Sequence, residues 1–153
     1  MNADLERQFI DTNVLVYAHD LSAGEKNTRA GRLIEELWET HQGCLSIQVL
    51  QEFYVTVTRK VPQPLAVTRA TQIITDLGFW HIHTPGVTDI LRAIDIQQKN
   101  RISFWDALVL QSALALGCKV VWSEDLNSGQ LYDEVKVINP FVDLGCINGE
   151  KKL

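Results

Sequence analysis

Four acidic residues stand at points of the sequence from which their side chains could act together: Asp11, Glu52, Asp106 and Asp125. Carboxylates that meet in one place repel each other and raise their own pKa values unless cations are present. A ligand set of oxygens without His or Cys suits the hard cations Mg²⁺ and Mn²⁺, and makes zinc a poor choice. One or two such ions can activate water and hold a phosphodiester. The chemistry predicted from these residues is therefore hydrolytic phosphodiester cleavage.

Three of the four acids also have an ordinary structural interpretation. If Ser103 caps the helix that follows it, Asp106 occupies the acidic third position of a capping box. Glu52 falls about 60° outside an apolar helical stripe, where solvated side chains are common. Glu124 and Asp125 could cap a short turn that follows them. No single acid therefore identifies a site, and the prediction depends on whether the four side chains meet.

The pattern of apolar residues predicts the elements that would have to position these acids. Short apolar and β-branched runs predict strands near residues 8–10, 44–45, 79–83, 119–122 and 135–138. Amphipathic stripes predict helices between them, at 25–41, from Ser46 to before Pro62, at 66–77, from Thr88 or Asp89 onward, and at 104–116. The last of these is apolar nearly all round and should be buried.

Strands that alternate with helices predict an α/β fold. We expect a central parallel sheet of four to five strands flanked by helices on both faces. Ligands of such sheets bind beyond the carboxyl ends of the strands. Asp11 lies at the end of the first predicted strand, and the segment Ser123-Glu124-Asp125 directly follows the strand at 119–122, so both should lie at that edge.

The bulk composition indicates one soluble domain over 1–153, with a core at about 8–142 and a C-terminal tail at 143–153. The net charge of -5 gives no overall basic face for nucleic acid. Local basic candidates are Arg29 with Arg32, Arg59 with Lys60, and Lys99 with Arg101. Their alternative interpretation is solvated helix faces.

Neither the cysteines nor the apolar segments indicate export. The three cysteines have no paired spacing and are interpreted as reduced thiols: Cys44, Cys118 and Cys146. The first residues lack the apolar region of a signal peptide, and no apolar run is long enough for a membrane span. We therefore expect a cytoplasmic protein without a membrane association.

Several segments, taken in order, resemble the PIN-domain nucleases, and among them the VapC-like toxins of toxin–antitoxin pairs. The resemblance covers most of residues 8–142. It rests on the segments Phe9-Ile10-Asp11-Thr12-Asn13-Val14-Leu15, Val49-Leu50-Gln51-Glu52-Phe53-Tyr54, Ser103-Phe104-Trp105-Asp106-Ala107-Leu108, Ser123-Glu124-Asp125-Leu126 with Gly129-Gln130, and Ile138-Asn139-Pro140-Phe141. Each segment alone is weakly specific, whereas their order and spacing together are specific.

The resemblance implies a PIN-like fold and a Mg²⁺- or Mn²⁺-dependent endoribonuclease that acts on RNA. Asp11 and Asp106 would be the principal metal ligands, Glu52 a further ligand, directly or through water, and Asp125 the fourth acid. Glu124 is the alternative for that fourth position. Supporting roles around the ligands would fall to Thr12, Asn13 and Ser123, for which ordinary turn chemistry is the alternative. The resemblance also implies an antitoxin partner and a homodimer.

Three other functions compete with this one. A haloacid-dehalogenase-like phosphatase would need a second Asp where Asn13 stands, and a response-regulator receiver would need a Lys-Pro near the last strand. A catalytically silent PIN-like interaction module would be favoured if the four acids did not converge. The aromatic and imidazole side chains are expected to be structural, with base stacking by one tryptophan as the alternative for Trp38, Trp80, Trp105 and Trp122. Of the histidines, His19 and His83 are the two that could approach the site.

Overall fold

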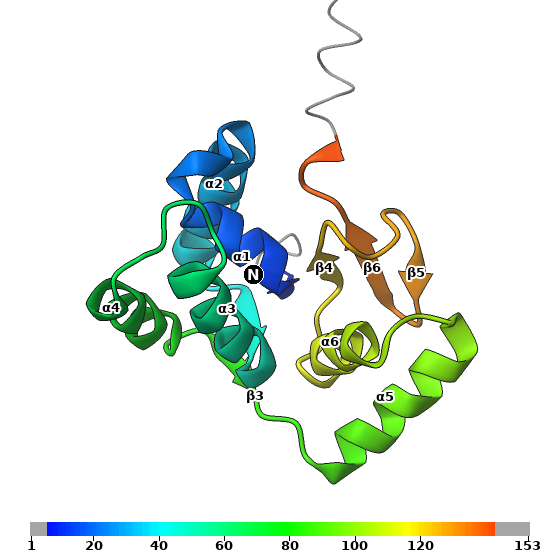
Figure 1. The fold of residues 1–153 in the computed structure, drawn as a ribbon. Helices are drawn as coiled ribbons and strands as arrows, with labels where there is room; N and C mark the ends of the chain where they lie inside the picture. Colours follow the sequence, from blue (N-terminus) through cyan, green and yellow to red (C-terminus); the bar gives the residue numbers. More distant parts are fainter. Residues whose placement is uncertain (1–5, 143–153) are drawn as a thin grey trace, which may run out of the picture.

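The computed structural model describes residues 6–142, and the expected tail with Cys146 lies outside the described residues. Six strands form one sheet in the order β3-β2-β1-β4-β6-β5 (Figure 1). All neighbouring strands are parallel except β5 and β6, which are antiparallel. The strands are β1 (Gln8–Ile10), β2 (Gly43–Ser46), β3 (His81–His83), β4 (Val120–Trp122), β5 (Leu131–Tyr132) and β6 (Val135–Ile138).

Six α-helices and one short 3₁₀ helix connect the strands. They are α1 (Thr12–Ala18), η1 (Leu21–Ala23), α2 (Glu25–Thr40), α3 (Ile47–Arg59), α4 (Val67–Leu77), α5 (Val87–Asn100) and α6 (Phe104–Ala115). Right-handed crossovers place α1 to α4 on one face of the sheet and α5 with α6 on the other. In agreement, α2 and α3 pack on β2, α6 packs on β2, β4 and β6, and α5 lies outside α6 (Figure 1). The predicted α/β class with a flanked parallel sheet is confirmed.

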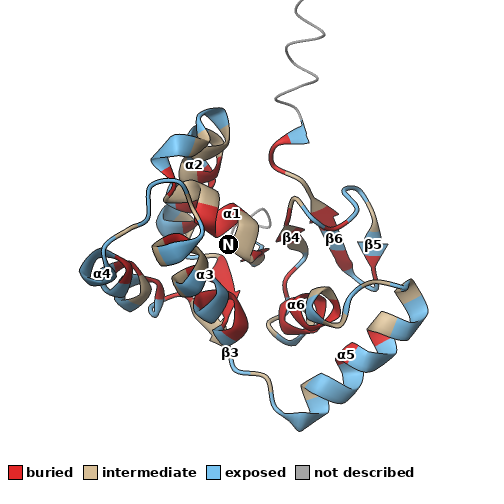
Figure 2. Cartoon of the chain, viewed as in Figure 1, coloured by how far each residue is buried: buried red, intermediate tan, exposed pale blue. Residues whose placement is uncertain are grey.

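Burial follows the predicted pattern (Figure 2). Residues 107–113 of α6 are all buried, as expected for a helix that is apolar nearly all round. Ser46 caps α3 by accepting a hydrogen bond from the backbone N–H of Val49. Gly43 allows the Trp80 ring to pack directly on β2, because a Cβ at Gly43 would lie 2.5 Å from that ring. Within residues 6–142, no helix is both long enough and apolar enough to cross a bilayer.

Three details differ from the sequence predictions. The strand expected at 79–83 begins only at His81, because the backbone N–H groups of Phe79 and Trp80 still bond to carbonyls at the end of α4. Helix α5 begins at Val87 after Gly86, and Asp89 lies in its first turn, where its carboxylate accepts from the Gly86 N–H. The sixth strand, β5, is an antiparallel edge strand of two residues, too short for its alternation to be recognised in the sequence.

Candidate active site

The strand order reverses between β1 and β4, which lie side by side in parallel with Ile10 opposite Trp122. After β1 the chain adds β2 and β3 on one side of this pair. After β4 it adds β6 and β5 on the other side. At such a point the loops that follow the two strands diverge and leave a crevice. Asp11 and the loop that begins at Ser123 follow these two strands directly. The topology therefore brings them to the same crevice.

Asp11 lies at the floor of the crevice and caps α1. Its side chain is 5% exposed. Its Oδ1 accepts a hydrogen bond from the Thr12 N–H at 2.7 Å, and its Oδ2 accepts one from the Ser123 hydroxyl at 2.8 Å. Burial raises the pKa of this carboxyl from 3.8 to about 6, and the nearby carboxylates of Asp106 and Asp125 also raise it. The fold thus holds a carboxylate where its charge is costly.

Asn13 and Ser123 join the loop after β4 to the start of α1. The Asn13 amide donates to Asp125 Oδ2 at 3.0 Å, and its oxygen accepts from the Glu124 N–H at 3.1 Å. The Ser123 hydroxyl accepts from the backbone N–H groups of Asp125 and Leu126. These bonds orient the Asp125 side chain toward Asp11.

Glu52 and Asp106 reach the crevice from two helices. The Thr12 hydroxyl donates to Glu52 Oε1 at 2.7 Å, which ties α3 to α1. Asp106 is the third residue of α6, and its N–H donates to the Ser103 hydroxyl at 3.0 Å. Burial raises the pKa of the Asp106 carboxyl, and the carboxylates of Asp125 and Glu52 raise it further. The four acids therefore act electrostatically on one another.

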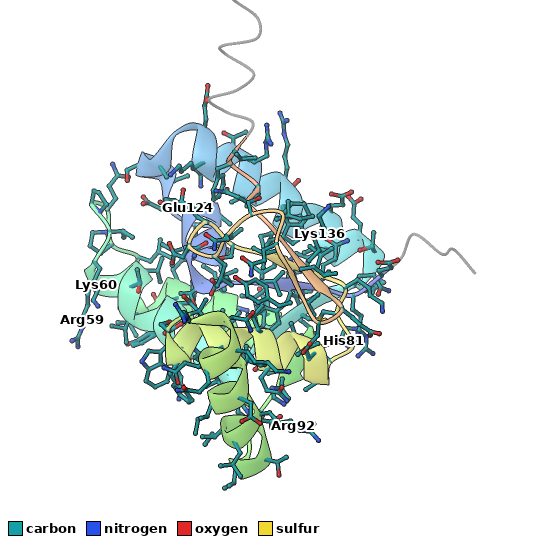
Figure 3. The ribbon with its side chains drawn as sticks, turned by 90° about the vertical axis from the view of Figure 1, so that its right-hand side faces the viewer. Arg59, Lys60, His81, Arg92, Glu124 and Lys136 are labelled. Atoms are coloured by element: carbon teal, nitrogen blue, oxygen red, sulfur yellow. The ribbon has the colours of Figure 1, made fainter. Side chains whose placement is uncertain are left out.

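All four predicted acids, together with Thr12 and Asn13, line one cavity of about 720 Å³. Ser123 is fully buried beneath it and bonds to Asp11. Glu124 is not among the residues that line this cavity, because it accepts from the Tyr17 hydroxyl at 2.9 Å and pairs with Lys26. Figure 3 shows Glu124 on the loop after β4. The geometry therefore places Asp125, not Glu124, with the other three acids.

The cavity also contains residues that the acidic pattern did not predict. The other polar side chains that line it include those of Asp20, Gln48 and Lys60, and the apolar ones include Trp105. Asp20 has a local structural function, since it caps η1 by accepting from the Ser22 N–H. Lys60 was predicted as one of several local basic residues, and Trp105 as a structural aromatic with base stacking as the alternative. No local pattern indicates that the two line the same cavity.

His19 and His83, the two histidines that could have approached the site, do not line the cavity. The His19 ring contacts the Leu15 carbonyl and packs edge-on to Phe53. The His83 ring lies 2.8 Å from the Ser112 hydroxyl and 3.4 Å from Asp89. Both are structural in this fold.

The donor set of the cavity suits a hard divalent cation. Among the described residues, the charged side chains that line it are five acidic ones and one basic one: Asp11, Asp20, Glu52, Asp106, Asp125 and Lys60. Within residues 6–142, no three His, Cys, Asp or Glu side chains are placed so that they could hold a metal ion together. Mg²⁺ usually keeps several waters and needs few direct protein ligands, so the residues present fit such an ion bound partly through water.

The fold and the crevice together define an α/β protein with a mostly parallel sheet and an acidic site at its topological switch point. The chain belongs to the PIN domain family, whose model matches residues 9–133. A comparison with curated proteins gave no match.

Three solved structures that share this fold are a toxin–antitoxin complex, a DNA-bound VapBC and a toxin. A toxin–antitoxin complex from Klebsiella pneumoniae matches with a TM-score of 0.63 at 19% identity, over 87% of this chain and 97% of that chain. DNA-bound VapBC from Salmonella typhimurium matches with a TM-score of 0.63 at 13% identity, over 88% and 98%. Mycobacterium tuberculosis VapC20, described as a Sarcin-Ricin loop cleaving toxin, matches with a TM-score of 0.59 at 16% identity, over 77% and 89%.

Proposed function

We propose that this protein is a divalent-metal-dependent endoribonuclease that hydrolyses RNA phosphodiester bonds. The observation that supports this most directly is the convergence of Asp11, Glu52, Asp106 and Asp125 in one cavity at the switch point of a PIN-family fold. The four residues come from two loops and two helices that are far apart in the sequence. Ordinary surface acids have no reason to gather there, because their mutual repulsion destabilises the fold.

In this proposal Asp11 and Asp106 hold Mg²⁺ or Mn²⁺, with Glu52 and Asp125 completing the site directly or through water. When bound, the cation would polarise the phosphodiester and make attack by water possible near neutral pH. The protein's own contribution is positioning. Thr12 and Ser123 fix the Asp11 carboxylate, Thr12 also holds Glu52, and Asn13 holds Asp125.

The geometry argues against the two phosphoryl-transfer alternatives. A phosphatase of the haloacid-dehalogenase type needs an acid two residues after Asp11, where Asn13 instead donates its amide to Asp125. A receiver needs a lysine in its acidic pocket near the last strand, whereas the cavity's one basic side chain within residues 6–142 is that of Lys60, at the end of α3. Incubation with a small phosphoryl donor is therefore expected to leave no adduct by mass.

Cleavage of RNA by the purified protein is expected to require an added divalent ion. A fluorescently labelled RNA should stay intact in excess chelator and be cut when Mg²⁺ or Mn²⁺ is restored, because the acidic cavity repels a phosphodiester unless a cation neutralises it. Potassium chloride at the same ionic strength serves as the control for charge screening alone. Full activity in excess chelator would contradict the proposal.

We also propose that the protein is the toxin of a VapBC-type pair, bound by an antitoxin, and that it forms a homodimer. The solved structures of toxin–antitoxin complexes with this fold support the partner. A surface for the dimer is offered by α5, whose exposed apolar side chains recur on one side of the helix: Val87, Ile90, Leu91 and Ile94. Light scattering is expected to give twice the 17.3 kDa chain mass, and Leu91→Glu to give the monomer. A monomeric wild type would contradict the homodimer. A wild type that does not arrest growth when expressed would contradict the toxin.

A further inference from the structure

Trp105 exposes more of its side chain than a structural tryptophan would. It is 60% exposed, against 37% for Trp38 and 9% for Trp80. Its neighbour in the chain is Asp106, and both line the acidic cavity. A large aromatic side chain therefore lies beside the acids with its surface open to a ligand.

The neighbours of Trp105 hold it in place. Its ring packs edge-to-face on Phe104, with 5.2 Å between the ring centroids and 73° between the ring planes. Its backbone carbonyl accepts a hydrogen bond from the Gln48 amide at 3.4 Å, which ties the first turn of α6 to α3. Gln48 is 8% exposed, and its Oε1 has no hydrogen-bond partner among the described residues. The contact with Phe104 restricts the indole ring, and a restricted side chain loses less entropy when a ligand stacks on it.

The cavity is also lined by apolar side chains and by one cation. Val55, Val61 and Pro62 line it, and Lys60 caps the C-terminus of α3. Arg59, one residue earlier, is exposed but does not line the cavity. Figure 3 shows Arg59 and Lys60 at the end of α3, away from the middle of the molecule. The cavity therefore combines a carboxylate cluster with apolar side chains and one positive charge.

We propose that part of this cavity is a base-binding subsite, in which Trp105 stacks an unpaired base of the RNA and Lys60 contacts an adjoining phosphate. The inference rests on the proposed nuclease function. It adds the residues that would favour single-stranded over double-stranded RNA. An indole face stacks on any base, but only when that base is free of a duplex. Lys60 is suited to the adjoining phosphate because the other charged groups of the cavity in the described chain are carboxylates, which repel it.

The stacking half of the proposal is tested with a single-stranded RNA of about eight nucleotides that carries one abasic position, moved along the strand. Binding is measured in the Asp106→Asn background with Mg²⁺, so that the RNA stays intact, and kcat and KM are measured in the cleaving protein. One abasic position should weaken binding roughly 5- to 100-fold. Trp105→Ala should weaken binding of the unmodified RNA by a similar factor and should bind abasic and unmodified RNA equally well. Trp105→Phe should keep part of the preference for unmodified RNA. Trp38→Ala is the matched control, since Trp38 does not line the cavity.

The phosphate half is tested by Lys60→Gln with Arg59→Gln as its matched control. Lys60→Gln should weaken binding several-fold and lower the slope of log K against log salt by about 0.7, the value for one phosphate contact to a single strand. Arg59→Gln should leave the slope within error of the wild type. Equal effects of the two variants would reject a specific contact by Lys60.

The outcomes separate this inference from the nuclease proposal. If the wild type cuts RNA but Trp105→Ala, confirmed as folded by circular dichroism, binds and discriminates like the wild type, the base-binding subsite is rejected and the nuclease proposal stands. The same result would follow if Trp105 were covered by a protein partner instead of RNA. If the wild type binds and cuts no RNA in either divalent ion, both proposals are rejected. Tighter binding of a hairpin stem than of a single strand would reject the subsite alone.

Discussion

Asp106→Asn and Asp11→Asn are each expected to slow RNA cleavage by roughly 10³-fold, which is the scale of removing a group that stabilises transition-state charge directly. An asparagine is nearly isosteric but neutral, so each variant keeps the shape of the cavity and removes a proposed metal ligand. The loss should be in kcat, with the single-turnover rate in Mg²⁺ as the measurement. Raising the Mg²⁺ concentration should restore part of the activity if the main defect is weaker ion binding.

Asp95→Asn and Glu124→Gln are the matched controls. Asp95 is an exposed acid on α5 outside the acidic cavity, so its loss should leave the rate within a factor of about two. Glu124 tests the fourth position, because it pairs with Lys26 and Tyr17 whereas its neighbour Asp125 faces Asp11. A larger rate loss for Glu124→Gln than for Asp125→Asn would overturn the assignment of Asp125.

In chelator, the free energy of unfolding of the wild type is expected to fall relative to that of Asp11→Asn as the pH rises. The folded pKa of Asp11, about 6, is above its ordinary value of 3.8, chiefly because of burial. The folded state therefore favours the protonated carboxyl, and this contribution to stability is complete below about pH 4 and is lost as the pH rises through 6. Between pH 4 and pH 8 the wild type should lose at most about 3 kcal/mol that the variant does not lose.

The measurement is the free energy of unfolding of both proteins in urea at pH 4, 6 and 8. The change in their difference with pH is the informative quantity, because the substitution also has a cost that does not depend on pH. The Ser123 hydroxyl already accepts from two backbone N–H groups, so it is poorly placed to accept from an asparagine amide as well. Mg²⁺ at pH 8 should then stabilise the wild type more than the variant. If the difference in unfolding free energy between the two proteins did not change with pH, the raised pKa of a buried Asp11 carboxyl would be contradicted.

Most of the fold prediction rested on patterns among residues that are close together in the sequence. The alternation of short apolar runs with amphipathic stripes was enough to predict an α/β fold with a flanked parallel sheet. Local signals placed Ser46 at the start of α3 and Asp106 in the first turn of α6, as the structure has them. They missed β5, because a two-residue edge strand that begins with the exposed Leu131 has no periodicity to detect.

The sequence by itself determined the elements, the family resemblance and a list of four acids, since helix stripes, caps and strand runs depend on neighbours in the chain. Only the tertiary structure decided that β1 and β4 lie side by side, that their loops meet, and that Asp125 turns toward Asp11 while Glu124 turns toward Lys26. It also decided that Trp105 and Lys60 border the same cavity. The physical reason is that strand order and side-chain direction are set by packing between segments far apart in the chain, which no local pattern records.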